Sequence, residues 1–223
     1  LRCAYAQGTV LIRTHLDSLP PQETISWPVF QEVREDWAGR IELQAACLFG
    51  IDRLDADDGY LTSMADRVSR AGGVLGAVTY MIPRLDEHLD AMFRAAAERD
   101  LPLDFHADET GDTGARTLRH IAEAALRNGF KGQVVVGHCC SLALQEPDEI
   151  DHTLDLVAQA GLGIVSLPMC NMYLQDRQAG RTPRWRGVTL LHEMKARGIP
   201  VAVASDNTRD PFYAYGDMNL IEV

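Results

Sequence analysis

Short apolar segments alternate with amphipathic ones along this sequence, and that alternation limits the folds open to it. The apolar segments begin about every 30 residues, the length of a strand–helix repeat. Runs such as Val134-Val135-Val136 are typical of strands buried on both faces of a parallel sheet. We therefore predict an α/β protein. Its expected strands cover residues 9–13, 41–47, 73–80, 101–106, 133–138, 162–167 and 199–205, with helices at 86–99, 113–128, 148–160 and 188–197.

Such alternation suits either an open doubly wound sheet or a closed (β/α)8 barrel. The sequence has no G-x-G-x-x-G after a predicted strand and no G-x-x-x-x-G-K-[ST], so the dinucleotide and P-loop folds lose their main support. Instead, ionisable residues end one strand after another, at His15, His106, His138 and Asp206. Because a TIM-type barrel carries its reactive groups at these strand ends, we predict that barrel, with its first strand preceding Leu1.

No linker, charge block or low-complexity segment interrupts the alternation. We therefore predict one barrel domain over residues 1–223, comprising strands two to eight. Residues 1–8 have no initiator Met and no signal-peptide pattern, and they resemble the end of a helix, while residues 218–223 resemble the start of another. We expect an internal piece of a longer polypeptide, truncated at both ends, that lacks strand one and the C-terminal part.

Charge and composition exclude several classes of function. The formal net charge is −11, and such a surface repels phosphate backbones, so we expect no nucleic-acid partner. No apolar stretch approaches the roughly 18 residues of a membrane helix, so we expect no membrane partner. Five cysteines are an odd number, and they fit reduced thiols in a cytoplasmic protein better than a disulfide framework. A homo-oligomer is left open.

Two histidines and two carboxylates at strand ends, His106, Glu109, His138 and Asp206, suggest metal-assisted hydrolysis. Each has a plainer interpretation, since a strand-end His is more often structural, Asp206 could cap a loop, and Asp108 and Glu109 could be solvated loop acids. Together, however, imidazole and carboxylate form a divalent-metal ligand set, and metal-bound water of near-neutral pKa is a hydrolytic nucleophile. We therefore predict one divalent metal ion, zinc or iron.

Several motifs follow one another in a fixed order along the whole chain. They are, from the N-terminus, Arg13-Thr14-His15-Leu16-Asp17, His106-Ala107-Asp108-Glu109, Gly137-His138, Asn171-Met172-Tyr173-Leu174-Gln175 with Pro183-Arg184-Trp185-Arg186-Gly187, and Ser205-Asp206-Asn207 with Asp210-Pro211-Phe212-Tyr213. In this order they resemble the bacterial cytosine deaminase family of the metal-dependent amidohydrolase superfamily, and residues 171–175 with 183–187 resemble that family's loop after strand seven. The combination is much more specific than any one of its motifs.

The resemblance implies roles for individual residues. His106 and Asp206 would be metal ligands, joined by a His-x-His pair that we expect upstream of Leu1. Glu109 would carry a proton to the substrate ring, and His138 would orient the attacking hydroxide. The implied reaction is hydrolytic deamination of an amidine-type ring carbon, in which Asp206 takes the hydroxide proton and ammonia leaves. A carboxylate that cycles a proton near neutral pH suits this chemistry.

Three departures from the family pattern bear on the ligands and the substrate. His15 stands alone where a His-x-His pair would be needed, so we interpret it as a supporting or structural residue. The segment Ala46-Cys47-Leu48-Phe49-Gly50 lacks the glutamine expected to hold a pyrimidine, and Asn207 replaces a second Asp. Because an amide both donates and accepts, Asn207 could select a different ring edge, or it could only hold its loop.

The substrate therefore stays open. We expect cytosine or a cytosine-like ring, with N-alkylamino s-triazines, pterins or creatinine as alternatives, because Ser205-Asp206-Asn207 also resembles the triazine-hydrolysing branch. Phe212 is expected to stack on a planar ring or to join the core. A hypothesis of another class is a barrel that binds a small molecule without turning it over, since two ligands alone cannot hold a catalytic metal firmly.

Overall fold

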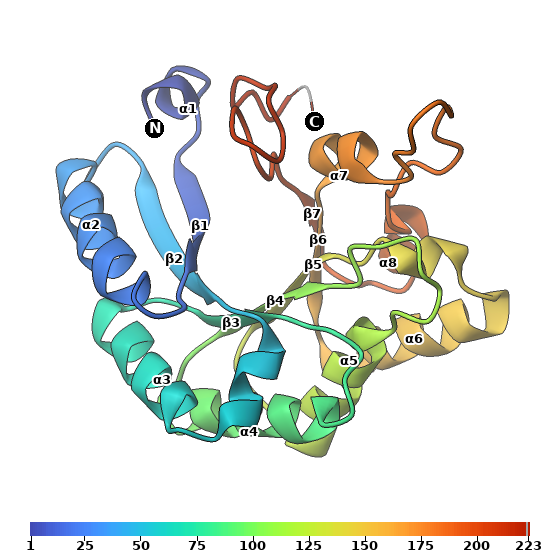
Figure 1. Ribbon diagram of the computed structural model, residues 1–223, viewed down its shortest axis with the longest axis horizontal. Coiled ribbons are helices and arrows are strands. Elements are labelled where there is room, and N and C mark those ends of the chain that lie inside the picture. Colours follow the sequence, from blue (N-terminus) through green and yellow to red (C-terminus); the bar gives the residue numbers. More distant parts are fainter. Residues whose placement is uncertain (222) are drawn as a thin grey trace.

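The computed structural model describes residues 1–221 and 223, and its strands form one curved parallel array (Figure 1). β1 (Leu11–Asp17) pairs with β2 (Glu42–Leu48), and two parallel bridges, Ala46 with Val74 and Gly50 with Val78, connect β2 to the next strand. A five-stranded sheet then follows in chain order: β3 (Leu75–Val78), β4 (Leu103–Ala107), β5 (Val134–His138), β6 (Gly163–Ser166) and β7 (Val201–Val203). All seven predicted strands are present, in the sequential parallel order of a barrel wall.

Helices cover the outer, convex side of this array (Figure 1). The four named from sequence are present as α4 (Leu85–Ala97), α5 (Thr117–Arg127), α6 (Pro147–Ala160) and a shortened α8 (Leu191–Ala196). The structure adds α2 (Glu23–Asp36), α3 (Tyr60–Ala71) and the 3-10 helices Ile51–Ala56 and Ser141–Leu144. No helix in the described part of the chain combines the length and apolar character needed to cross a membrane.

The sequence predictions for three segments, two at the termini and one after a strand, have different outcomes in the structure. The helical end expected at residues 1–8 is confirmed as α1 (Arg2–Ala6). The segment expected as a loop after the strand at 162–167 forms a short helix, α7 (Pro168–Leu174), which Pro168 starts because its fixed φ suits a first helical turn. The helix expected at residues 218–223 is wrong for the described residues, because Met218 has a left-handed φ of 67° that an α-helix excludes.

Polar residues on two strands face the concave interior. On β4, Phe105 faces outward, and its ring centroid lies 6.0 Å from that of Phe93 on α4. Asp104 and His106 alternate with it and face inward, because successive side chains of a strand point to opposite sides. Asp104 contacts Arg13 of β1 across the interior. For the same reason β1 continues to Asp17, beyond the predicted end at residue 13: its polar residues line the interior instead of ending the strand.

The strands around β3 approach closely, and this requires a glycine. A Cβ built on Gly76 would lie 2.3 Å from the carbonyl oxygen of Asp104 and 2.8 Å from that of Cys47, so any side chain would push β2 or β4 away. The Cys47 sulfur accepts a hydrogen bond from the Gly76 N–H at 3.2 Å. All five cysteines are free, as predicted, and Cys47 is one of the four that are buried.

Candidate active site

The chain adopts a left-handed backbone after three of the strands that carry predicted site residues. Asp108 follows β4 with φ 56°, His138 ends β5 with φ 69°, and Asp206 lies beyond β7 with φ 59°. Side chains rarely adopt these φ values, and such conformations concentrate at functional sites, where surrounding contacts hold them. Each one turns the chain sharply at the carboxyl end of a strand.

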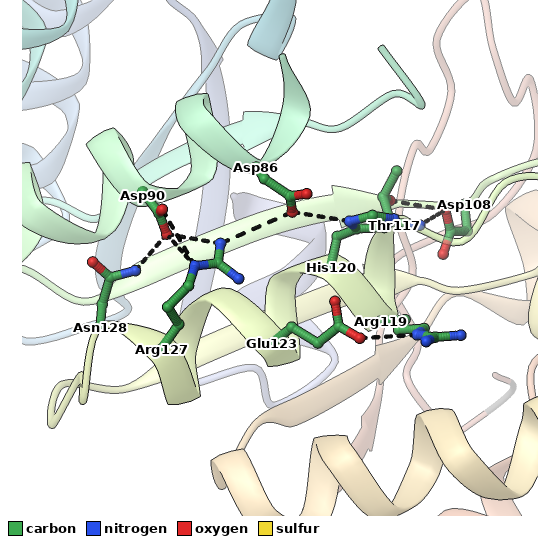
Figure 2. A network of polar contacts seen from close by, with 9 residues as sticks. All are labelled: Asp86, Asp90, Asp108, Thr117, Arg119, His120, Glu123, Arg127 and Asn128. Carbon is green, nitrogen blue, oxygen red and sulfur yellow. Dashed lines mark hydrogen bonds and ion pairs between the residues drawn. The ribbon is translucent and has the colours of Figure 1, made fainter. Parts of the chain in front are cut away.

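The turn at Asp108 separates two neighbouring carboxylates. Asp108 is buried and points to α5, where it accepts hydrogen bonds from the Thr117 N–H at 2.8 Å, the Leu118 N–H at 2.9 Å and the Thr117 hydroxyl at 2.8 Å (Figure 2). It therefore satisfies the free N–H groups at the start of this helix, as a capping residue does. The interpretation of Asp108 as a solvated loop acid is wrong. Glu109, in contrast, contacts Asn171 and His138.

Glu109, His138 and Asp206 form one cluster, in which one ligand atom of each lies within 4.8 Å of the others. The Oε1 atom of Glu109 lies 3.4 Å from Nδ1 of His138. The Oδ2 atom of Asp206 is buried and has no hydrogen-bond partner among the described residues. Since a buried carboxylate oxygen is costly to leave unpaired, this atom marks a place where a cation or a proton would be stabilised.

The surroundings of Glu109 raise its pKa to about 7. Burial is the main cause, and the neighbouring charge of Asp206 adds to it, whereas the hydrogen bond from Asn171 works in the opposite direction. The value is reached although 36% of the Glu109 side chain remains accessible. A carboxyl group with this pKa exists in both protonation states near neutral pH, which is the property required of a group that takes up and returns a proton.

The two histidines of the predicted site are in direct contact, with Nε2 of His138 lying 3.2 Å from Nδ1 of His106. Burial lowers the pKa of His106 to about 3, and the nearby His15 and His138 add to this effect. Burial also lowers the pKa of His138, by more than the charge of Asp206 raises it. Both imidazoles are therefore neutral at neutral pH, the form in which histidine binds metals.

On its other side, His106 adjoins a second polar group. The His15 and His106 rings meet edge to face at 4.3 Å between centroids, and Nε2 of His15 lies 3.1 Å from Oδ1 of Asp104. Arg13 donates to the other oxygen of Asp104 at 2.9 Å. Burial would raise the pKa of Asp104, but its contacts with His15 and Arg13 outweigh burial and hold the pKa below its ordinary value. We call Arg13, His15 and Asp104 the interior ion cluster.

The predicted metal ligands His106 and Asp206 fall in different groups. Among the described residues, one ligand atom each of His15, Asp104 and His106 also lie within 4.8 Å of one another, and the His106–His138 contact connects this group to the Asp206 cluster. Both oxygens of Asp104 already have partners, so it is poorly suited to a cation. The unpartnered Oδ2 of Asp206, together with neutral imidazoles, fits the nitrogen and oxygen donors that zinc or iron takes in proteins.

The two residues predicted to bind substrate lie in the loop after β7. Asn207 donates to Oδ2 of Asp210 at 2.6 Å, while the other oxygen of Asp210 accepts from the Phe212 N–H at 2.9 Å and the Tyr213 N–H at 3.0 Å. Asn207 therefore holds this loop in the structure. Phe212 is 64% exposed, which excludes the alternative that it belongs to the core.

Sequence analysis missed the partners of these residues. Asn171 on α7 contacts both Glu109 and His138, and Asp104 and Arg13 support the interior. A signal for the last two was present, because Asp104 precedes His106 by two residues and Arg13 precedes His15 by two, so each pair shares one face of a strand. No local signal distinguished Asn171.

Sequence comparisons link this chain to known hydrolases. The sequence model described as "Amidohydrolase family" matches residues 39–222. A pterin deaminase from Rhizobium rhizogenes is 60% identical over 223 residues, which are 100% of this chain and 51% of that protein. An N-isopropylammelide isopropyl amidohydrolase from Pseudomonas sp. (strain ADP) is 25% identical over 219 residues, 96% of this chain and 50% of that protein. The chain thus spans about half the length of these curated relatives.

Solved structures share the fold. A 5-methylcytosine deaminase from Klebsiella pneumoniae, liganded with 5-fluorocytosine, superposes with a TM-score of 0.88 over 99% of this chain and 54% of that one, at 24% identity. An N-isopropylammelide isopropylaminohydrolase from Burkholderia multivorans superposes with a TM-score of 0.74 over 99% of this chain and 53% of that one, also at 24% identity. These likenesses confirm the predicted fold class, a part of a TIM-type barrel.

Proposed function

We propose, on the premise that this chain belongs to the amidohydrolase family, that its protein is a metal-dependent hydrolase that removes an amino group from a pterin. The main support for hydrolytic deamination as the reaction class is the position of the Glu109 carboxyl group. Its pKa is about 7, and it lies beside His138 and the unpartnered oxygen of Asp206. The choice of a pterin, one of the alternatives to cytosine, is supported by the pterin deaminase that is 60% identical. The 5-methylcytosine deaminase is 24% identical and supports the fold alone.

The proposed metal ligands of this chain are His106 and Asp206. Burial keeps His106 neutral, and Asp206 offers a buried oxygen that has no other partner in the described part of the chain. A divalent ion bound there, zinc or iron, would make a hydroxide nucleophile available at neutral pH. The sequence resemblance to cytosine deaminases implies that the other ligands are a His-x-His pair, which the 223 residues do not contain.

The proton steps follow from the positions of three side chains. With Oδ2, the atom that lacks a partner, left for the metal, Asp206 would receive the proton of the attacking water on its other carboxylate oxygen. Glu109 would deliver a proton to the ring nitrogen next to the carbon under attack, since a pKa of about 7 allows it to give up and regain a proton near neutral pH. His138, neutral and almost fully buried, would orient the water. The proton held by Asp206 would then pass to the amino group, which leaves as ammonia while the ring carbon becomes a carbonyl.

Two residues of the loop after β7 are proposed to contact the ring. Phe212 is exposed, so its ring is accessible for stacking on a planar heterocycle. One hydrogen of the Asn207 amide is donated to Asp210 in this structure, so a substrate edge would meet the second amide hydrogen or the amide oxygen.

The test uses the full-length protein, with metal analysis and with release of ammonia from pterin and cytosine, and of isopropylamine from N-isopropylammelide, measured in parallel. We expect about one equivalent of zinc or iron and the highest kcat/KM on pterin. Faster turnover of cytosine or of N-isopropylammelide would show that this compound and not a pterin is the preferred substrate, and the protein would still be a hydrolase of ring-bound amino groups. A metal-loaded protein that releases an amine or ammonia from none of the three, nor ammonia from creatinine, would favour the non-catalytic barrel.

A further inference from the structure

Asn171 joins two residues of the candidate active site. It lies on α7 and is 1% exposed. Its Nδ2 atom is 2.9 Å from Oε1 of Glu109 and 3.2 Å from Nδ1 of His138. A single amide group therefore touches the proposed proton carrier and the proposed orienting histidine at once.

The number of protons on each group decides what these contacts mean. An ionised carboxylate only accepts hydrogen bonds, so the amide must turn its NH2 group toward Glu109. That group has a second hydrogen, which faces Nδ1 of His138, and Nδ1 must then be the unprotonated nitrogen. A neutral imidazole carries one proton, so the proton of His138 sits on Nε2 and faces Nδ1 of His106 at 3.2 Å.

The rest of α7 holds Asn171 in place. Gln175, the next residue after this helix, donates from its side chain to the Glu109 carbonyl oxygen at 3.2 Å. The ring of Tyr173 meets those of Tyr213 and Tyr215 at centroid distances of 5.2 and 5.9 Å. The helix is thus attached both to the loop after β4 and to the loop after β7, and these contacts fix the backbone that carries Asn171.

We propose that Asn171 is a positioning residue that holds the Glu109 carboxylate against His138 and keeps the His138 proton on Nε2. His138 thereby keeps its N–H donor on the side of His106, the proposed metal ligand, and Glu109 presents its other oxygen. The catalytic consequence rests on the proposed function, because it assumes that Glu109 and His138 act on a substrate. The proton position on His138 does not depend on that assumption.

A purely structural role for Asn171 makes different predictions. A buried amide that only satisfies its neighbours would stabilise the fold, and its replacement would lower stability without moving the His138 proton. The position of that proton is therefore the discriminating measurement. It can be read from the 15N chemical shifts of histidine-labelled protein, since protonated and unprotonated ring nitrogens differ strongly.

The experiment compares zinc-loaded full-length protein with three variants at about pH 8.5, where Glu109 is ionised. The unaltered protein should show His138 protonated on Nε2. Asn171→Leu removes both donors and should give a mixture of the two tautomers. Asn171→Asp keeps the shape of the side chain but only accepts, so it should draw the proton to Nδ1.

The matched control is Asn128, at the end of α5. Its Nδ2 atom also donates to a carboxylate, Asp90 at 2.6 Å, and to a second acceptor, the carbonyl oxygen of Ala124 at 2.9 Å (Figure 2). Asn128→Leu therefore removes equivalent contacts far from the candidate active site. We expect the His138 tautomer and the turnover of this variant to equal those of the unaltered protein.

Activity on pterin completes the test. Asn171→Leu should lower kcat by about 10²-fold and change KM by less than about threefold, since misplaced catalytic groups affect the chemical step most. The proposal is overturned if His138 carries its proton on Nδ1 in the unaltered protein, or if neither Asn171 variant moves it. A protein that shows the expected tautomers but deaminates no heterocycle would refute the proposed function and leave this hydrogen-bond arrangement intact.

Discussion

Asp104 lies within β4 and Glu109 lies in the loop that follows this strand, and the pKa values of these two carboxyl groups shift in opposite directions. Burial acts on both in the same sense, because it disfavours the charged form. Asp104 nevertheless stays acidic, since Arg13 and His15 each contact one of its oxygens. The Glu109 carboxyl accepts a hydrogen bond from the neutral Asn171 and faces the negative charge of Asp206, so burial raises its pKa to about 7 with no arginine or lysine partner among the described residues to oppose it.

The comparison shows that the partners of a carboxylate, more than its depth, decide whether it supports the fold or carries protons. A buried carboxylate with an arginine on one oxygen and a histidine on the other is fixed in one charge state and keeps β1 against β4. One that lacks a cationic partner can change its charge near neutral pH. The predictions below test this division of roles, beginning with the largest expected effect.

Removing the proton carrier should affect chemistry and not the metal. Glu109→Gln keeps the shape of the side chain but cannot transfer a proton, so we expect turnover of pterin to fall at least about 10²-fold with the metal content unchanged. Steady-state kinetics and metal analysis check this. The matched control is the neighbouring Asp108→Asn, which weakens the start of α5 and should leave turnover within about threefold. Near-normal turnover in Glu109→Gln would mean that Glu109 is a solvated loop acid without a role in proton transfer.

Removing a partner of Asp104 should affect stability. Arg13→Met leaves the buried carboxylate with His15 alone, and we expect a loss of about 2 kcal/mol in the free energy of unfolding, less than for a fully buried pair because Arg13 is partly exposed. Urea unfolding of the full-length protein measures this loss. Adding Asp104→Leu to Arg13→Met should restore part of it, because no buried charge is then left unpaired. If the double variant is less stable than the single one, the ionic account of this cluster is wrong.

The two carboxylates should give opposite dependences of stability on pH. The pKa of Asp104 is lower in the folded state than its ordinary 3.8, so the stability it contributes is present above about pH 4 and is lost as the pH falls below that value. The pKa of Glu109 is raised from 4.5 to about 7, so the folded state holds its proton longer than the unfolded state does. Stability should therefore decrease as the pH rises from about 4.5 to 7.

Melting temperatures of metal-free protein between pH 3 and 8 separate these two contributions. Asp104→Asn should flatten the acid side of the profile, and Glu109→Gln should flatten the decrease toward pH 7. Each variant should leave the other part of the profile as it is in the unaltered protein. A Glu109→Gln profile identical to that of the unaltered protein would show that Glu109 has an ordinary pKa.

The smallest effect is expected where an ion pair lies on the surface. Arg119 pairs with Glu123 at 2.9 Å, one turn along α5, and with Glu149 at 3.3 Å (Figure 2 shows the first pair). Exposed pairs contribute little because water and salt screen them. Arg119→Ala should change the free energy of unfolding by no more than about 0.5 kcal/mol, with no change in turnover. A loss as large as that of Arg13→Met would remove the contrast between interior and surface ion pairs.

The sequence by itself determined the strand–helix alternation, the seven strands and the placement of His106, Glu109, His138 and Asp206 at strand ends. These features follow from local periodicity, because apolar runs and turn residues act over a few neighbouring positions. The same reasoning failed at residues 218–221, where one left-handed residue replaces an expected helix. It also treated residues 171–175 as part of a loop, and so the short helix that carries Asn171 was not expected.

Only the tertiary structure decided which of these residues meet. Arg13 and Asp104 are 91 positions apart, and Asn171 and Glu109 are 62 apart, so no local pattern pairs them. A single backbone angle at Asp108 turns that carboxylate to α5 while its neighbour Glu109 joins His138. The charge state of a group depends on the partners that folding brings to it, and curvature of the parallel array brings β1 and α7 to the end of β4.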